Sequence, residues 1–404
     1  MSLLLSDTSI CEVVSFFTKF GIDVGLLVPT YTGLDKSILD ANSAFRDFLS
    51  IYKIHDYEKQ LQGTNNKVII ESKFVGLDCS QVSKTSLYRP ETKSGDPRIW
   101  FSGLKQYANP NNLLVFFIGN KGDFYCVNAS NKKLMESGNH QGSYFNSLLC
   151  KSIPEKSAIA SDLLNLIKTI SMKGYVKSLR SGPTGVGFTL ETLLGISANS
   201  SKEPDFCGIE IKSGRVNSKG KPKSRSTLFS AVPDWSSSVI NSATKILALH
   251  GYKKGNGRLQ LYCTLDNKPN SLGFYLNVDN GEDVLHALKN SNNELNNIVQ
   301  WGIPKLRVSL AQKHKETFWV KAMTQKNNGS EEFYFTEVEH TFSPFTVNLG
   351  SLFTEGIIQV DFTLSMKELS NGGSKTRDHG YLFKIWDYNR NLIFPPGKTY
   401  SLIG

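Results

Sequence analysis

In the first third of this chain, apolar residues recur mainly at spacings typical of strands. In the rest of the chain, their spacings are typical of both helices and strands. The β-rich apolar runs are bounded by Gly, Asn and Pro, and they lie at residues 23–30, 67–76, 112–120 and 123–130. Between the first two runs, Ile38, Phe45, Phe48 and Leu49 predict an amphipathic helix over residues 37–52. We therefore predict a β-rich domain over residues 1–130.

The next stretch of the chain interrupts this pattern. It is rich in Asn, Ser, Gly and Lys without a sustained apolar period, so we assign residues 131–156 to a linker. After it, Leu163, Ile167 and Ile170 recur at helical spacing. This spacing predicts a helix that opens a second domain over residues 157–404.

A short predicted strand in the second domain carries the most informative chemistry. Ile209 and Ile211 alternate with Glu210 and Lys212, so a strand here puts both charged groups on one face. Asp205 lies just upstream, where a hairpin or bend can bring its carboxylate beside that of Glu210. Two converging carboxylates form a hard-oxygen site that suits Mg²⁺, and a neighbouring lysine can orient or help to deprotonate a water molecule. The alternative is an ordinary edge strand with a solvated Glu/Lys face.

The surroundings of this strand carry a family resemblance. Upstream, a glycine-rich loop over residues 182–187 leads into a helical segment with Glu191, fourteen residues before Asp205. Downstream follow "STLFSAVPDW" at residues 226–235 and "KTRDHGYLFKI" at residues 375–385. These blocks, in this order, resemble the MvaI/BcnI family of restriction endonucleases, which are relatives of the mismatch-repair nickase MutH. Ser230 departs from the family pattern, which has threonine at this position.

The resemblance implies both a fold class and a set of catalytic residues. The expected fold is α/β, with a PD-(D/E)xK nuclease core in which helices flank a mixed central sheet. Asp205, Glu210 and Glu191 would hold Mg²⁺, and Lys212 would position or activate the attacking water. A helix-surface carboxylate is the alternative reading of Glu191.

The resemblance also implies a function. We expect a type II restriction enzyme, an Mg²⁺-dependent endonuclease that cuts double-stranded DNA at a specific sequence and leaves 5′-phosphate ends. The expected target is a short pseudosymmetric CC-N-GG site that a monomer cuts by sequential nicking, with a companion DNA methyltransferase. Two alternatives remain, a MutH-like DNA repair nickase and a catalytically idle DNA-binding protein. The second is disfavoured because every acidic position and the lysine are intact.

The C-terminal block supplies the expected base contacts. Within this family's Asp-His-Gly block the histidine lies in the DNA cleft, so we expect His379 to read bases. Arg377 suits a bidentate contact to guanine or a phosphate, and Asp378 suits cytosine N4 or support of the arginine. Lys375 completes the group of DNA-binding candidates in this block.

The glycine-rich loop adds two more DNA-binding candidates, Thr184 and Gly185. Glycines here let the backbone approach a DNA phosphate at a helix N-terminus, or simply make a tight turn. The spacing also matches a nucleotide-binding P-loop, but Phe188 stands where the phosphate-binding lysine must be. An ATPase is therefore disfavoured.

Basic and aromatic residues alternate in the N-terminal half. Arg89, Lys93 and Arg98 are interleaved with aromatic residues such as Trp100 and Tyr107, a mixture that suits DNA phosphate contacts and stacking. The segment from Gly95 to Phe117 resembles the B3-type effector domain of EcoRII, which UbaLAI joins to an MvaI-like nuclease. We therefore expect a B3-like pseudobarrel that binds DNA. A scaffold domain with ordinary surface lysines is the alternative.

Composition is consistent with these expectations. The 404 residues favour two domains, and a net charge of +10 favours a polyanionic partner. The six cysteines are scattered without a Cys-x-x-Cys pair, which argues against a zinc site or a disulfide framework. We find no signal peptide and no run of about 18 apolar residues that would span a membrane. We therefore expect a bacterial cytoplasmic protein.

Overall fold

The computed structural model describes residues 8–119, 122–149, 158–196, 204–253, 255, 257–291, 294–368 and 374–403. The chain forms two compact units. The first comprises Met1–Ser152 with two short later segments, Val278–Val284 and Val347–Leu352. The second comprises the remainder. In the part of the chain that the structure describes, no helix is both long enough and apolar enough to cross a membrane.

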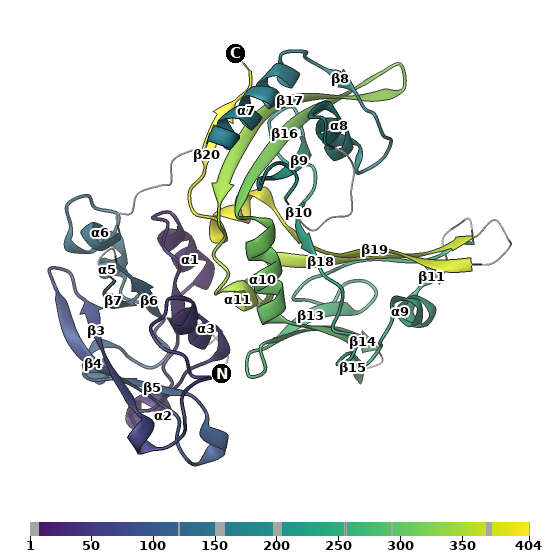
Figure 1. Ribbon diagram of the computed structural model, residues 1–404. Helices are drawn as coiled ribbons and strands as arrows, with labels where there is room; N and C mark the ends of the chain where they lie inside the picture. The colour runs from purple at the N-terminus through teal and green to yellow at the C-terminus, as the bar shows by residue number, and fades with distance from the viewer. Residues whose placement is uncertain are drawn as a thin grey trace. The chain divides into compact units, whose positions relative to one another are not determined.

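The first unit is built on a seven-stranded sheet with strand order β1-β6-β7-β3-β4-β5-β2 (Figure 1). The strands are β1 (Gly25–Leu27), β2 (Leu39–Asp40), β3 (Val68–Val75), β4 (Ser80–Tyr88), β5 (Arg98–Phe101), β6 (Leu114–Ile118) and β7 (Phe124–Asn128). The four predicted β-rich runs are thereby confirmed as β1, β3, β6 and β7. The short helices and 3₁₀ turns are α1 (Ile10–Thr18), α2 (Tyr31–Asp35), α3 (Ser43–Ile51), η2 (Thr64–Asn66), η3 (Lys93–Gly95), α4 (Leu104–Tyr107), α5 (Lys132–Ser137) and α6 (Tyr144–Leu149).

The helix predicted over residues 37–52 is shorter than expected. It begins at Ser43 because the Asn42 side chain accepts a hydrogen bond from the Phe45 backbone N–H at 2.9 Å, which caps the helix. Before the cap, Leu39–Asp40 pairs with β5 as a strand. Phe45 and Phe48 are fully buried in the core of this unit, as the helical spacing predicted.

The structure also differs from the predicted linker over residues 131–156. Helices α5 and α6 occupy most of residues 132–149, and Phe145 and Leu149 are fully buried. The Phe145 ring stacks on that of Phe16 in α1, with 6.0 Å between centroids. These residues therefore belong to the first unit, because the apolar side chains of Phe145 and Leu149 are buried in it although the surrounding sequence is polar. Residues 150–157 lie outside the described part of the chain.

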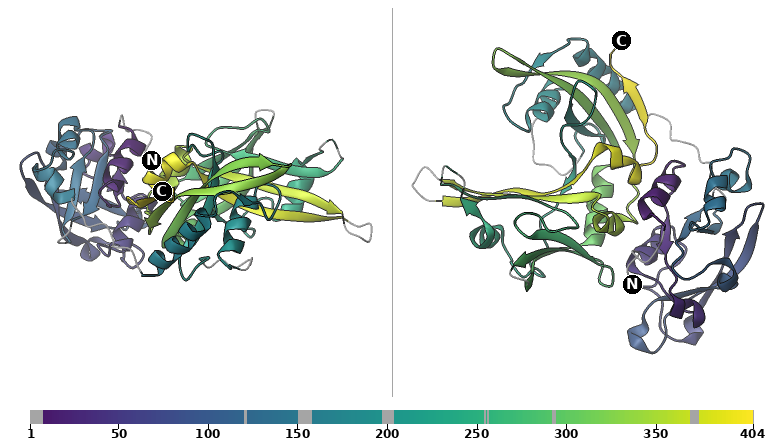
Figure 2. Two further views of the ribbon diagram at one scale, coloured as in Figure 1. Left: turned by 90° about the horizontal axis from the view of Figure 1, so that it is seen from above. Right: turned by 180° about the vertical axis from the view of Figure 1, so that it is seen from behind.

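The second unit contains a mixed sheet with strand order β20-β17-β16-β9, and β8 also pairs with β17. The strands are β8 (Val176–Lys177), β9 (Glu210–Val216), β16 (Glu316–Asn327), β17 (Ser330–Phe342) and β20 (Lys398–Ser401). Helices α7 (Ala158–Ser171) and α8 (Gly185–Leu193) lie against this sheet (Figures 1 and 2). Leu163, Leu164 and Ile167 of α7 pack with Val186 and Leu190 of α8 on apolar residues of β9, β16 and β17. The helix predicted from the spacing of Leu163, Ile167 and Ile170 is thus confirmed.

A second sheet of this unit has strand order β10-β19-β18-β12-β11. Its strands are β10 (Ser226–Ser230), β11 (Tyr252–Lys253), β12 (Leu259–Leu265), β18 (Ile358–Glu368) and β19 (Ser374–Ile385), and β18 and β19 form a long ribbon (Figure 1). The remaining elements of the chain are α9 (Ala243–His250), β13 (Phe274–Asp279), β14 (Val284–Ser291), β15 (Glu294–Gly302), α10 (Ile303–Lys313), α11 (Leu349–Thr354) and η4 (Asp387–Leu392), and most of α11 belongs to the first unit. The central mixed sheet with flanking helices is the architecture predicted for this unit.

Candidate active site

A tight hairpin places Asp205 at the start of strand β9. The Phe206 N–H donates to the Ile209 carbonyl at 2.9 Å, and the Ile209 N–H donates back at 2.8 Å. Cys207 and Gly208, between them, both have positive φ, 46° and 92°, which is the conformation of a two-residue hairpin turn. The Asp205 Oδ2 atom then accepts a hydrogen bond from the Ile211 N–H at 3.0 Å. The hairpin expected from the sequence is therefore present.

Glu210 is fully buried and lies between two lysines. Its Oε1 atom accepts a hydrogen bond from the Lys212 ammonium, and its Oε2 atom lies 2.9 Å from Lys313 Nζ. Lys212 is on the same strand, whereas Lys313 is the last residue of α10. The Lys313 contact was not foreseen, because no local pattern links a lysine so distant in sequence to Glu210. Two cations beside one buried carboxylate compensate for its loss of hydration.

Glu191 lies on α8, and its carboxylate interacts electrostatically with those of Asp205 and Glu210. Burial raises the pKa of Glu191, and the charges of Asp205 and Glu210 raise it further. Burial likewise raises the pKa of Glu210, where the charge of Asp205 adds to the effect and those of Lys212 and Lys313 oppose it. The three carboxylates therefore lie close enough to repel one another. A cation placed among them would relieve that repulsion.

The donor set fits a hard divalent cation, because it consists of carboxylate oxygens alone. The donors are not gathered into a finished coordination shell. Over the described ranges, no three His, Cys, Asp or Glu side chains are close enough together to hold an ion. Each lysine contact takes one lone pair of a Glu210 oxygen, so each oxygen keeps a second lone pair for a metal ion. Asp205, Glu210 and Glu191 are the residues of this chain that would hold the metal.

Arg215 anchors the glycine-rich loop beside this site. Its guanidinium forms a paired contact with Glu331 at 2.8 Å and donates to the carbonyls of Gly182 and Pro183 at 2.9 Å and 2.8 Å. Gly185 begins α8, and a Cβ atom at this position would lie 2.4 Å from the Arg180 carbonyl oxygen. Close packing alone therefore requires glycine at 185. Thr184 precedes the helix, is exposed, and makes no side-chain cap.

The four candidate DNA-binding residues of the C-terminal block lie together on β19. Lys375, Arg377, Asp378 and His379 are exposed, and they belong to the second sheet rather than to the sheet that carries Glu210. The Asp378 side chain accepts a hydrogen bond from the Gly380 N–H at 2.7 Å. This hydrogen bond restricts the backbone conformation on both sides of His379.

Burial lowers the pKa of His379, and the charges of Arg377 and Arg258 lower it further. Arg258 is a neighbour that the sequence did not indicate. It is held to β18 by hydrogen bonds to the Met366 carbonyl and the Ser365 hydroxyl at 2.7 Å and 2.6 Å. Arginine is well suited to phosphate and base contacts, so Arg258 extends the basic surface around His379.

The basic residues predicted to bind DNA in the N-terminal unit differ from one another in their contacts. Arg89 donates to three backbone carbonyls, the shortest bond being 2.8 Å to Gly95, so its guanidinium braces a loop. Arg98 is half-buried, and its carbonyl accepts a hydrogen bond from the Tyr57 hydroxyl. The side chain of Lys93 lies outside the described residues. Tyr107 stacks on a core phenylalanine ring and donates to the Val75 carbonyl, so it is a structural residue rather than a free stacking platform.

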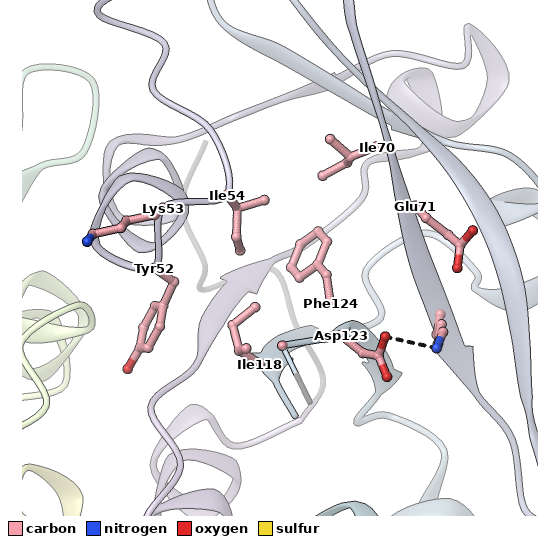
Figure 3. A pocket seen from close by; sticks show the side chains of 10 residues that line it. Tyr52, Lys53, Ile54, Ile70, Glu71, Ile118, Asp123 and Phe124 are labelled. Carbon is pink, nitrogen blue, oxygen red and sulfur yellow. Dashed lines mark ion pairs between the residues drawn. The ribbon is translucent and has the colours of Figure 1, made fainter. Parts of the chain in front are cut away.

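A pocket of about 340 Å³ opens in the same unit (Figure 3). Its apolar lining includes Ile54, Ile70 and Phe124. Lys73, which also lines it, pairs with Asp123 at 3.0 Å. The lining also includes Lys53 and Glu71, so its two lysines are matched by two carboxylates and the pocket has no excess of positive charge to attract a phosphate.

The hairpin with Asp205, the strand with Glu210 and Lys212, and the mixed sheet covered by helices define a nuclease of the PD-(D/E)xK class. The model of the MvaI/BcnI restriction endonuclease family matches residues 164–394. The chain therefore belongs to this family and is a type II site-specific deoxyribonuclease. The resemblance found in the sequence is confirmed. A search among curated proteins found no match.

Two solved structures are similar to this chain. One is a complex of restriction endonuclease MvaI with its cognate DNA substrate, with 23% identity and a TM-score of 0.53. The other is MvaI in the absence of DNA, with 23% identity and a TM-score of 0.37. Each match covers 62% of this chain and 100% of the other. The first supports the nuclease fold, and because it covers 62% of this chain, the chain contains residues without a counterpart in that structure.

Proposed function

We propose that this restriction endonuclease cuts double-stranded DNA with Mg²⁺ as its metal ion and leaves 5′-phosphate ends. The observation that carries the proposal is the hairpin that brings Asp205 beside the strand of Glu210, whose buried carboxylate contacts Lys212 and Lys313. Such a cluster of hard oxygen donors suits Mg²⁺ better than softer metals. The family as a whole generally uses divalent metal ions.

Each residue of the cluster has a distinct role in this proposal. Asp205, Glu210 and Glu191 hold the metal, which when bound supplies a Lewis acid for the scissile phosphate and its attacking water. Lys212 lies beside Glu210 and orients or helps to deprotonate that water. Lys313 balances the second oxygen of Glu210 and keeps this carboxylate ionised in its buried position.

The reading surface of β19 supports specificity for a short sequence. Arg377, Asp378 and His379 contact base edges, and Lys375 contacts a phosphate. Thr184 and Gly185 bring the backbone at the start of α8 near a second phosphate. We propose a pseudosymmetric CC-N-GG target, which a monomer cuts by nicking one strand and then the other. A companion methyltransferase protects the same site in a bacterial cytoplasm.

The N-terminal unit is proposed to hold DNA as an effector or tethering module of B3-like character. Arg98 and Lys93 are its candidate phosphate contacts, and Arg89 acts through the loop that it braces. A second DNA-binding unit on one chain raises the effective local concentration of the nuclease at the target.

A MutH-like nickase is the second candidate function. It is distinguished by its product, since a nickase leaves one strand intact while a restriction enzyme completes the double-strand break. The purified protein is therefore incubated with supercoiled plasmid and Mg²⁺, and the ends are mapped. Linear product with fixed ends supports restriction, and nicked product alone supports the nickase.

The active-site assignment is tested by Asp205→Ala and Lys212→Ala. Cleavage should be abolished while DNA binding is retained, because the variants lose the positioning of metal and water but keep the DNA-binding candidates on β19. Replacing Asp205 also removes a negative charge near the phosphates, so binding should not weaken. Cleavage by either variant at the wild-type rate would contradict the assignment.

A further inference from the structure

His314 directly follows Lys313 and is completely buried at the end of α10. The sequence places it outside every family block, and the proposed chemistry does not use it. Its ring stacks on the Trp319 ring, with 5.3 Å between centroids and 9° between planes. Trp319 in turn lies opposite Lys212 in the parallel pairing of β16 with β9. Paired residues of neighbouring strands share a sheet face, so the imidazole packs over β16 on the face that carries Glu210 and Lys212.

Both ring nitrogens of His314 have partners that determine its tautomer. Nε2 lies 2.7 Å from the Leu228 carbonyl oxygen, which can only accept, so Nε2 carries the proton. Nδ1 then accepts a hydrogen bond from the Thr317 hydroxyl at 2.9 Å. Burial lowers the pKa of His314 to about 3, and the charges of Lys212 and Lys313 contribute. The ring therefore stays neutral at physiological pH and works as a fixed donor and acceptor.

The two hydrogen bonds join the reading sheet to the catalytic sheet. Leu228 lies on β10, which pairs with the base-reading strand β19. Thr317 lies on β16, directly opposite Glu210. Lys313, the residue before His314, contacts the second oxygen of Glu210. The neutral His314 side chain thus connects β10, which pairs with β19, to Thr317 on β16, which lies opposite Glu210.

We propose that His314 is a positioning residue that couples the placement of the reading sheet to the placement of Glu210. A displacement of β10 changes the Leu228–His314 bond, and the ring carries that change to Thr317 and to Lys313. DNA whose bases fit β19 holds β10 in place and keeps Glu210 aligned. The inference rests on the proposed function, because it assumes that Glu210 serves the metal and that β19 reads the DNA.

Three substitutions separate the contacts of His314. His314→Phe keeps an aromatic ring against Trp319 but removes both hydrogen bonds. His314→Gln places an amide N–H near the former Nε2 and restores the bond to Leu228. Thr317→Val keeps the shape of the side chain and removes only the bond to Nδ1. Ser171→Ala is the matched control, since it removes a buried hydroxyl that donates to the Phe335 carbonyl at 2.6 Å elsewhere in this unit.

The decisive measurement is the single-turnover cleavage rate at saturating enzyme, compared with DNA affinity in Ca²⁺ and with the thermal midpoint. We expect His314→Phe to bind the target normally but to cut it more slowly by as much as about 10²-fold, since small misplacements of catalytic groups have effects of this size. His314→Gln should recover part of the rate, and Thr317→Val should lose part of it. Ser171→Ala should lower the thermal midpoint without changing the rate of the folded enzyme.

The outcomes distinguish this proposal from the proposed function. If the wild-type protein cuts no DNA with Mg²⁺, both are wrong. If the wild type cuts and His314→Phe cuts equally fast at saturation, His314 has only a structural role, like Ser171. If His314→Phe does not fold, Thr317→Val decides alone, and an unchanged rate for that variant overturns the coupling.

Discussion

Replacing Lys313 by methionine leaves the buried Glu210 carboxylate with one cation instead of two. The methionine keeps most of the apolar stem of the lysine, so packing changes little and the lost charge dominates. The Lys313 side chain is 19% exposed and Glu210 is 0% exposed, so bulk solvent screens this pair weakly. We expect the variant to fold with reduced stability in metal-free buffer.

The geometry sets the size of the effect. Unit charges 2.9 Å apart attract by about 6 kcal/mol at an effective dielectric constant of about 20. The loss cannot reach this value, because Glu210 can take up a proton instead. With an ordinary pKa of 4.5 for glutamate, protonation at pH 7 costs about 3.4 kcal/mol. The expected loss in the free energy of unfolding is therefore about 1–3 kcal/mol near pH 7.

The effect should depend on pH in a definite direction. A carboxyl group with a raised pKa in the folded state is tolerated while it is protonated, and it costs stability as pH rises toward that pKa. Removing Lys313 raises the Glu210 pKa further, so the variant should lose more stability at about pH 7.5 than at about pH 5.5.

Urea denaturation in EDTA at both pH values measures this difference. Lys305→Met is the control, because Lys305 is on the same helix but is 75% exposed. Surface pairs of this kind contribute about 0–1 kcal/mol. An equal loss of stability at both pH values for Lys313→Met would refute the electrostatic reasoning and leave only a packing effect.

Two further predictions concern DNA recognition and retention. His379→Ala should relax discrimination at one or two base pairs, at about 1–3 kcal/mol per lost contact, while nonspecific affinity stays the same. Cleavage rates across all single-base variants of the mapped site measure this, and an unaltered preference would contradict it. A chain that starts at residue 153 should retain the chemistry but release more nicked plasmid before the second cut, because one tether to DNA is lost. Identical time courses for both chains, with no duplex binding by the N-terminal fragment at low salt, would make that unit a scaffold.

Local patterns predicted several elements of the fold. The alternation around Ile209 and Ile211 predicted strand β9, and the apolar spacing after residue 160 predicted α7, because in both cases the core contacts lie at a fixed period. The hairpin at Asp205 followed from the short spacing between two charged positions. The linker expected over residues 131–156 differs from the structure because the apolar residues there show no regular period. Only two apolar side chains, Phe145 and Leu149, hold α6 in the core, too few to produce a periodic signal.

The candidate site was predicted only where its residues are close in sequence. Asp205, Glu210 and Lys212 belong to one hairpin and strand, so a short motif contains them. Lys313 at the end of α10 and Arg258 just before β12 reach their partners through tertiary packing. No spacing in the sequence encodes those contacts. The contacts of Arg89 were not predicted either, because its guanidinium donates to the carbonyls of residues distant in sequence such as Tyr57 and Gln60.

The order of strands along the chain has a consequence during protein synthesis. Strand β9 pairs only with β16 among the described strands of its sheet, and Glu210 lies opposite Thr317. A nascent chain that has just made Glu210 therefore has no neighbouring strand for it until residue 317 has emerged. Strand β10, which carries the His314 contact, finds its own partner β19 later still. Such long-range pairing forms late. A chain that ends before residue 317 thus lacks the strand with which β9 pairs, and its nuclease centre stays unassembled.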